Sequence, residues 1–120
     1  MIVCVALGPS GDVDPRWGRA ERVAIARVTQ HGVESWQEID VGWDGLHDAG
    51  TEGGHHARIA RFLGEHKVEA VVANHMGPPM EHMLSKMGLV VRLGASGPAR
   101  EAALRVLDAD TGLAGQGPRS

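Results

Sequence analysis

Residues 2–7, Ile-Val-Cys-Val-Ala-Leu, form an unbroken apolar run that stops at Gly8 and Pro9. A run of this kind is typical of a β-strand that is buried on both faces. We therefore expect a sheet that is covered by other elements. A chain of 120 residues can bury one such core and is too short for a second.

The segment after this strand predicts a hairpin. Residues 22–29 alternate polar and apolar side chains, residues 30–32 read as a turn, and residues 33–41 read as the second strand. We expect the hairpin to pair beside the first strand.

Helical spacing of apolar residues marks three later segments, which begin near Gly54, Pro78 and Pro98. Short apolar runs at 68–73 and 89–93 separate these segments and read as strands. The order β-β-β-α-β-α-β-α predicts an α/β fold with a mixed five-stranded sheet that is covered by helices. We expect one domain over residues 1–107 and a flexible carboxyl-terminal tail over residues 108–120.

Composition excludes several classes of protein. The single cysteine, Cys4, allows neither an internal disulfide nor a zinc module with two thiolates, and its place in the strand predicts a buried, inert thiol. The chain shows no export signal and no apolar run near the roughly 20 residues of a membrane span, so we expect a cytoplasmic protein. A net charge of −3 disfavours binding to nucleic acid.

Common catalytic motifs are missing from the sequence. No serine or cysteine lies in a G-x-S-x-G elbow, and Gly8-Pro9-Ser10-Gly11-Asp12 lacks the G-K-[ST] ending of a phosphate-binding loop. The first strand offers no carboxylate for a two-metal nuclease. We therefore expect a binding protein and not an enzyme.

The seven histidines are the strongest functional signal. Right-handed crossovers place five of them at the carboxyl edge of the sheet, where open α/β sheets bind ligands. These five are His47, His55, His56, His75 and His82. Imidazole is the commonest protein ligand of metals, and the neighbouring methionines add soft thioethers, so iron or copper is expected more than magnesium.

His55, His56 and His75 are the main candidate ligands, and His82 is a secondary one. His55 and His56 lie at the start of the first helix, and His75 directly follows a buried strand, next to Asn74 as a candidate cofactor contact. The alternative for each histidine is an ordinary hydrogen-bonded or solvated side chain. A metal held by neutral imidazoles would bind more weakly below about pH 6.5.

Other side chains at this edge are candidates for contact with a bound group. Arg16 and Trp17 could flank the group or its negative charge, although either residue could simply anchor its loop. Met76 is free to act as a soft ligand. Met80 and Met83 occupy the apolar stripe of a helix, where packing is the simpler role.

Several short motifs lie in an order that resembles one known family. They occupy residues 14–20, 53–54, 68–73, 76–78, 87–91, 94–97 and 101–102. Together they resemble the dinitrogenase iron-molybdenum cofactor biosynthesis family, which includes NifX-like carriers and the carboxyl-terminal domain of NifB. The resemblance extends from Met1 to about Leu107.

The resemblance implies a ribonuclease H-like three-layer fold without nuclease activity. It also implies a role in holding or passing clusters of iron, sulfur and sometimes molybdenum. One departure concerns Arg16 and Trp17, because the family motif usually has His-Phe at this point. A ligand that the family may use there is absent, and His55, His56 and His75 could compensate.

The leading hypothesis is a non-catalytic carrier of an iron–sulfur or iron–molybdenum cluster that uses these histidines. It would be a monomer or homodimer, and cluster donor or acceptor proteins would be its partners. One alternative is a protein-interaction module that holds no metal. Another is a binder of a single copper or zinc ion.

Overall fold

A computed structural model describes residues 1–46 and 52–114 of the chain. Its elements follow the predicted order, with two short additional helices in segments that read as loops. The elements are β1 (Ile2–Leu7), η1 (Trp17–Arg19), β2 (Arg22–Thr29), β3 (Gly32–Asp40), α1 (Trp43–Leu46), α2 (Glu52–Glu65), β4 (Ala70–Val72), α3 (Pro78–Lys86), β5 (Val90–Arg92) and α4 (Ala99–Ala114).

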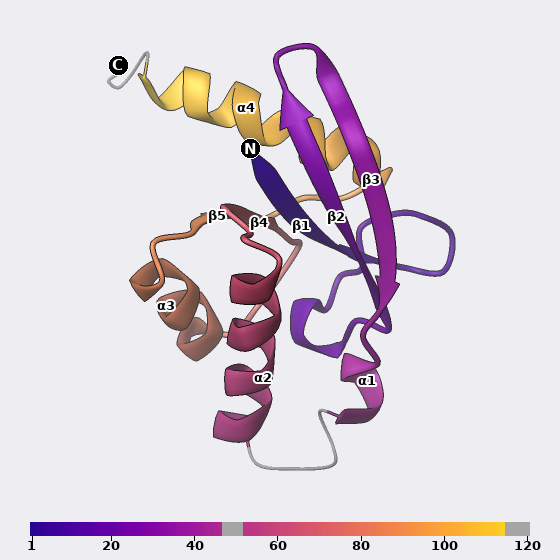
Figure 1. Ribbon diagram of the computed structural model, residues 1–120, viewed down its shortest axis with the longest axis vertical. Coiled ribbons are helices and arrows are strands. Elements are labelled where there is room, and N and C mark those ends of the chain that lie inside the picture. The colour runs from indigo at the N-terminus through magenta and orange to yellow at the C-terminus, as the bar shows by residue number, and fades with distance from the viewer. Residues whose placement is uncertain (47–51, 115–120) are drawn as a thin grey trace.

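The five strands form one mixed sheet in the order β3-β2-β1-β4-β5 (Figure 1). β1, β2 and β3 pair antiparallel as a meander, whereas β4 and β5 run parallel to β1. The prediction of an α/β fold with a mixed five-stranded sheet is confirmed.

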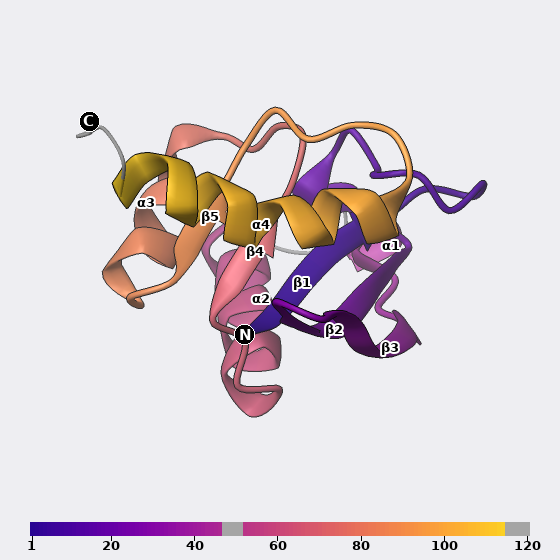
Figure 2. The same ribbon diagram turned by 90° about the horizontal axis from the view of Figure 1, so that it is seen from above.

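Alternate side chains of β1 enter two separate cores, as the unbroken apolar run requires. Cys4 and Ala6 join a cluster with residues of α2 and α3, and Val3 and Val5 join a cluster with residues of α4. Figures 1 and 2 show α2 and α3 on one face of the sheet and α4 on the other. The molecule therefore has three layers, with the sheet in the middle.

The loops at the carboxyl edge of the sheet are tied together by their backbones. The N–H of Val13 donates to the carbonyl of Gly97 at 2.9 Å, and the N–H of Gly94 donates to the carbonyl of Asn74 at 2.9 Å. The N–H of Trp17 donates to the carbonyl of His75 at 3.3 Å. These bonds connect the segments that follow β1, β4 and β5, and so give this edge a fixed shape.

Two helices differ in extent from the sequence expectation. α1 lies in a stretch that read as a polar loop, and it forms around Trp43, which is 2% exposed and packs edge-on against Trp17 and Phe62. α4 continues to Ala114, beyond the expected end of the last helix near Leu107. His47 lies outside the described residues. No helix in the described ranges is long and apolar enough to span a membrane.

Candidate functional site

A pocket of about 260 Å³ opens at the carboxyl edge of the sheet. Its wall is built by the η1 segment, the start of α2, and the segment from the end of β4 into α3. The lining residues are Arg16, Trp17, Gly18, Arg19, His55, His56, His75, Met76, Gly77, Pro79 and Met80. Residues that are far apart in the sequence therefore meet at the carboxyl edge of the sheet, the edge that right-handed crossovers indicated.

The three main histidine candidates all line this pocket, but they differ in accessibility. His55 is buried, His56 is half-buried and His75 is exposed. Within residues 1–46 and 52–114, no group of three or more His, Cys, Asp or Glu side chains is placed to hold a metal ion. The histidines share one pocket, and in this arrangement they do not surround one point.

His55 has a structural contact that limits it as a ligand. Its Nε2 lies 2.7 Å from the carbonyl oxygen of Gly18. A carbonyl only accepts hydrogen bonds, so Nε2 carries the proton and cannot bind a metal at the same time. Only Nδ1, which is buried, could coordinate. His56 and His75 are the more accessible imidazoles of the pocket.

Two other candidate residues lie away from the pocket lining. His82 is exposed on α3, one turn beyond the residues that line the pocket. Asn74 is half-buried, and its side-chain amide donates to the carbonyl of Ala95 at 3.0 Å. Asn74 therefore braces the loop that follows β5.

Arg16 and Arg19 give the pocket its positive charge. Arg16 precedes η1 with an extended backbone and Arg19 is the last residue of η1, and the N–H of Arg19 donates to the carbonyl of Arg16 at 3.2 Å. The Arg16 side chain is largely exposed, with its Nε 4.0 Å from the Asp14 carboxylate, and the backbone N–H of Arg16 donates to Asp14 Oδ1 at 2.8 Å. None of the lining residues in the described part of the chain is acidic.

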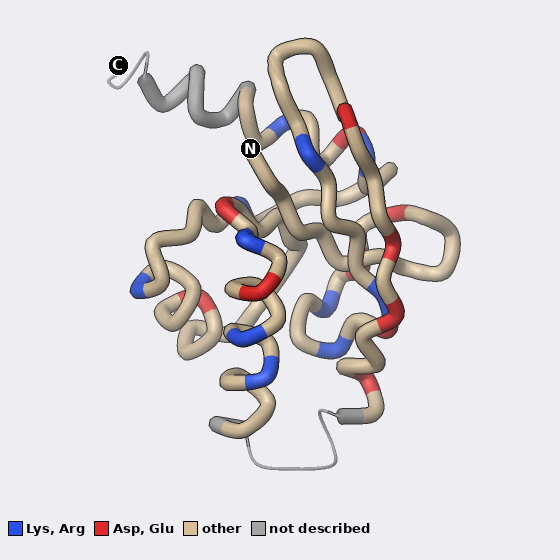
Figure 3. Tube along the Cα trace, viewed as in Figure 1, with Lys and Arg blue, Asp and Glu red and all other residues tan. Residues whose placement is uncertain are grey.

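Figure 3 shows where the charged residues lie along the chain. Lys and Arg mark the segment before β2 and the middle of α2, whereas acidic residues are spaced along β3, which contains Glu34, Glu38 and Asp40. Acidic residues also lie close to the two arginines, because Arg16 and Arg19 line a second pocket of about 330 Å³ together with Asp14, Glu21 and Asp44.

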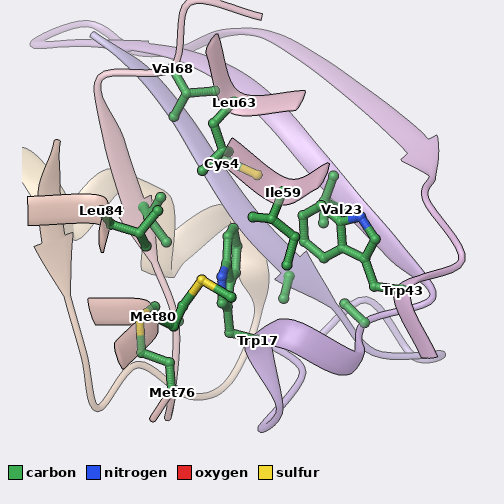
Figure 4. Close-up of a cluster of buried hydrophobic side chains, with 14 residues drawn as sticks. Cys4, Trp17, Val23, Trp43, Ile59, Leu63, Val68, Met76, Met80 and Leu84 are labelled. Carbon is green, nitrogen blue, oxygen red and sulfur yellow. The ribbon is translucent and has the colours of Figure 1, made fainter. Parts of the chain in front are cut away.

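The floor of the pocket is apolar and soft. Trp17 is fully buried, and Met76 and Met80 are 7% and 5% exposed. A Cβ built on Gly18 would lie 3.8 Å from the terminal methyl of Met80 and 3.9 Å from Nε2 of His55, so these two side chains flank the η1 turn. Figure 4 shows Trp17 standing between Met80 and Trp43 in the core.

Sequence reasoning did not select Arg19 or Met80 for the site. Arg19 follows Arg16 within the motif of residues 14–20, and this closeness in the sequence was the signal that could have included it. Met80 occupies a core position of α3, as the sequence predicted, but its side chain also lines the pocket. A residue at the end of a core can serve both roles.

Comparisons with known proteins agree with this architecture. The family model described as dinitrogenase iron-molybdenum cofactor matches residues 1–109. A search of curated proteins gives no significant match.

Several solved structures have the same fold. The apo form of the orange protein from Desulfovibrio gigas is 25% identical with a TM-score of 0.70, and the alignment covers 90% of this chain and 88% of that chain. The protein PH0822 is 14% identical with a TM-score of 0.72, covering 91% and 90% of the two chains. A Thermotoga protein assigned to the NifB type is 21% identical with a TM-score of 0.64, covering 89% and 87%.

Proposed function

We propose that this chain, which belongs to the dinitrogenase iron-molybdenum cofactor family, is a non-catalytic protein that binds an anionic metal–sulfur cluster in the pocket between Arg16, Trp17 and His75. The cluster is of the iron-molybdenum or iron–sulfur type and is cargo. In this proposal the protein works in the cytoplasm, and its partners are the proteins that donate or accept the cluster.

The observation that carries the proposal is the chemistry of the pocket lining. Two arginines, three histidines and two methionines line one space, and no described lining residue is acidic. Guanidinium groups favour anions, and imidazole and thioether favour iron, copper and sulfur-rich clusters over magnesium or calcium. A soft, negatively charged ligand satisfies both preferences at once.

The pocket supports loose attachment of the cluster. The Nε2–H of His55 is directed at Gly18, so His56 and His75 are the proposed imidazole ligands, and Arg16 and Arg19 balance the charge. Two imidazoles leave most metal sites of a cluster free for the next protein. A carrier needs this arrangement because its cargo must leave.

A single copper ion is the second candidate, and the nearness of His75, Met76 and Met80 in one lining favours it. Imidazole and thioether are suitable copper ligands. Two arginines beside the same space oppose a bare cation, because the like charges repel. The cluster is therefore the better proposal.

Metal and sulfide analysis of protein that is purified without oxygen tests the proposal. Equilibrium dialysis against tetrathiomolybdate, a soft molybdenum–sulfur anion, should give saturable binding of one anion per chain, and Cu²⁺ or Zn²⁺ should bind more weakly. His75→Ala should weaken binding, whereas His82→Ala, an equally exposed histidine outside the lining, should not. A chain that binds no thioanion and still captures a protein partner would contradict the proposal and support an interaction module without metal.

A further inference from the structure

Trp17 carries a polar group that the core does not use. Its side chain is fully buried, and its indole Nε1 has no hydrogen-bond partner within the described part of the chain. Native proteins rarely leave a buried N–H without an acceptor, because the group has lost its water and gained nothing in return. Such a donor in the wall of a binding pocket indicates that a ligand supplies the acceptor.

Met80 is a neighbour of Trp17 in the wall of the pocket. Trp17 and Met80 both line the pocket, and in Figure 4 the nitrogen-bearing edge of the Trp17 ring lies on the side of Met80. The terminal methyl of Met80 reaches the neighbouring Gly18, 3.8 Å from the place of a Cβ. Met80 and Trp17 thus belong to the same part of the pocket wall and to the same core cluster.

The two side chains differ in how easily they can move. Trp17 is fixed by its backbone bond to His75 at 3.3 Å and by edge-on packing against Trp43 at 5.3 Å between ring centroids. Met80 has three rotatable side-chain bonds and a polarizable sulfur, so it can adopt another rotamer with little strain. A ligand in the pocket can displace Met80 while the indole stays in place.

We propose that the indole N–H of Trp17 donates a hydrogen bond to a sulfur atom of the bound cluster, after the Met80 side chain has moved aside. This inference rests on the proposed function. Cluster sulfurs accept hydrogen bonds, and such bonds influence both the affinity and the redox potential of a cluster. The bond makes Trp17 a selective contact for a sulfur-rich anion over a bare metal ion, which offers no acceptor.

NMR of the full chain tests the proposal, because the three tryptophans give three indole N–H signals. Addition of tetrathiomolybdate should shift the Trp17 signal. The Trp36 signal is the internal reference because its Nε1 donates to Glu38 at 3.0 Å, and it should stay in place. Variants Trp36→Phe and Trp43→Phe assign the signals by elimination, so the test does not depend on the folding of a Trp17 variant.

Affinity gives a second readout. Trp17→Phe keeps an aromatic ring and removes the donor, and it should weaken tetrathiomolybdate binding about tenfold, the usual loss for a hydrogen bond to a charged group. Trp43→Phe, in the same core but outside the pocket lining, should change affinity less than about twofold. Saturable binding with an unmoved Trp17 signal, or with equal affinity for Trp17→Phe, overturns this inference alone. An absence of binding by the wild type overturns both the inference and the proposed function.

Discussion

His55 Nε2 donates a hydrogen bond of 2.7 Å to the carbonyl oxygen of Gly18, across 37 positions of sequence. This bond holds the start of α2 against η1, the two segments that carry His56 and Arg19. The buried imidazole thus fixes the shape of the pocket, while the more exposed histidines are left to meet a ligand.

Because of this bond, substitution of His55 should destabilise the fold more than substitution of His56. His55→Ala leaves the Gly18 carbonyl without its donor and opens a gap in the core, so the free energy of unfolding should fall by about 1–3 kcal/mol. His56→Ala, at a half-buried position on the same helix, should change it by less than about 0.5 kcal/mol. Urea denaturation of both variants measures the difference, and equal losses would contradict the structural role given to His55.

The arginines should control affinity through charge. Arg16→Gln and Arg19→Gln combined should weaken tetrathiomolybdate binding at least about tenfold at low salt. The difference in affinity from wild type should shrink at higher salt, because salt screens the attraction of the two arginines in the wild type. Arg61→Gln, on the exposed face of α2 outside the pocket, is the matched control. If Arg61→Gln caused the same loss, affinity would depend on total charge and not on this pocket.

Lys67 has a backbone conformation that suits glycine. Its φ is 56°, in the left-handed region, two residues after the end of α2. Lys67→Gly should raise the free energy of unfolding by about 0.5–1 kcal/mol, because a side chain there is strained. Lys86→Gly, inside the last turn of α3, should instead lower it by roughly 1 kcal/mol. Thermal and urea unfolding of the pair check the opposite signs.

The buried Cys4 thiol should make the free energy of unfolding fall at alkaline pH. Complete burial raises the pKa of this thiol well above its ordinary value. The folded chain therefore keeps the proton that the unfolded chain releases above about pH 8.5, and wild-type stability is lost as pH rises from there. The difference in unfolding free energy between wild type and Cys4→Ala should be constant near neutral pH. Above about pH 9 it should change by up to about 1.4 kcal/mol per pH unit in favour of the variant. A constant difference up to pH 10 would contradict burial of the thiol.

The sheet and the helical layers on its two faces were predictable because local sequence patterns indicate them. The run at residues 2–7 required burial on both faces, and chain direction then placed His55, His56 and His75 at one edge without knowledge of any contact. α1 was missed because Trp43 is the one buried residue among the positions of α1 whose burial is described, and one residue gives no periodicity.

The finer geometry of the site had no sequence signal. The partner of His55 is a backbone carbonyl, which every residue possesses, so no residue type indicates that bond. The exclusion of His82 from the lining depends on the rotation of α3, which its packing against the sheet determines. Sequence could therefore locate the pocket but could not assign a role to each histidine.

The central claim is that the pocket between Arg19 and His75 holds an anionic metal–sulfur cluster. Anomalous diffraction at the molybdenum absorption edge, from crystals of the protein loaded with tetrathiomolybdate, tests it most directly. We expect one molybdenum peak per chain inside this pocket, with Met80 displaced from its present position. A peak at another place on the surface, or no ordered molybdenum despite saturable binding in solution, would contradict it.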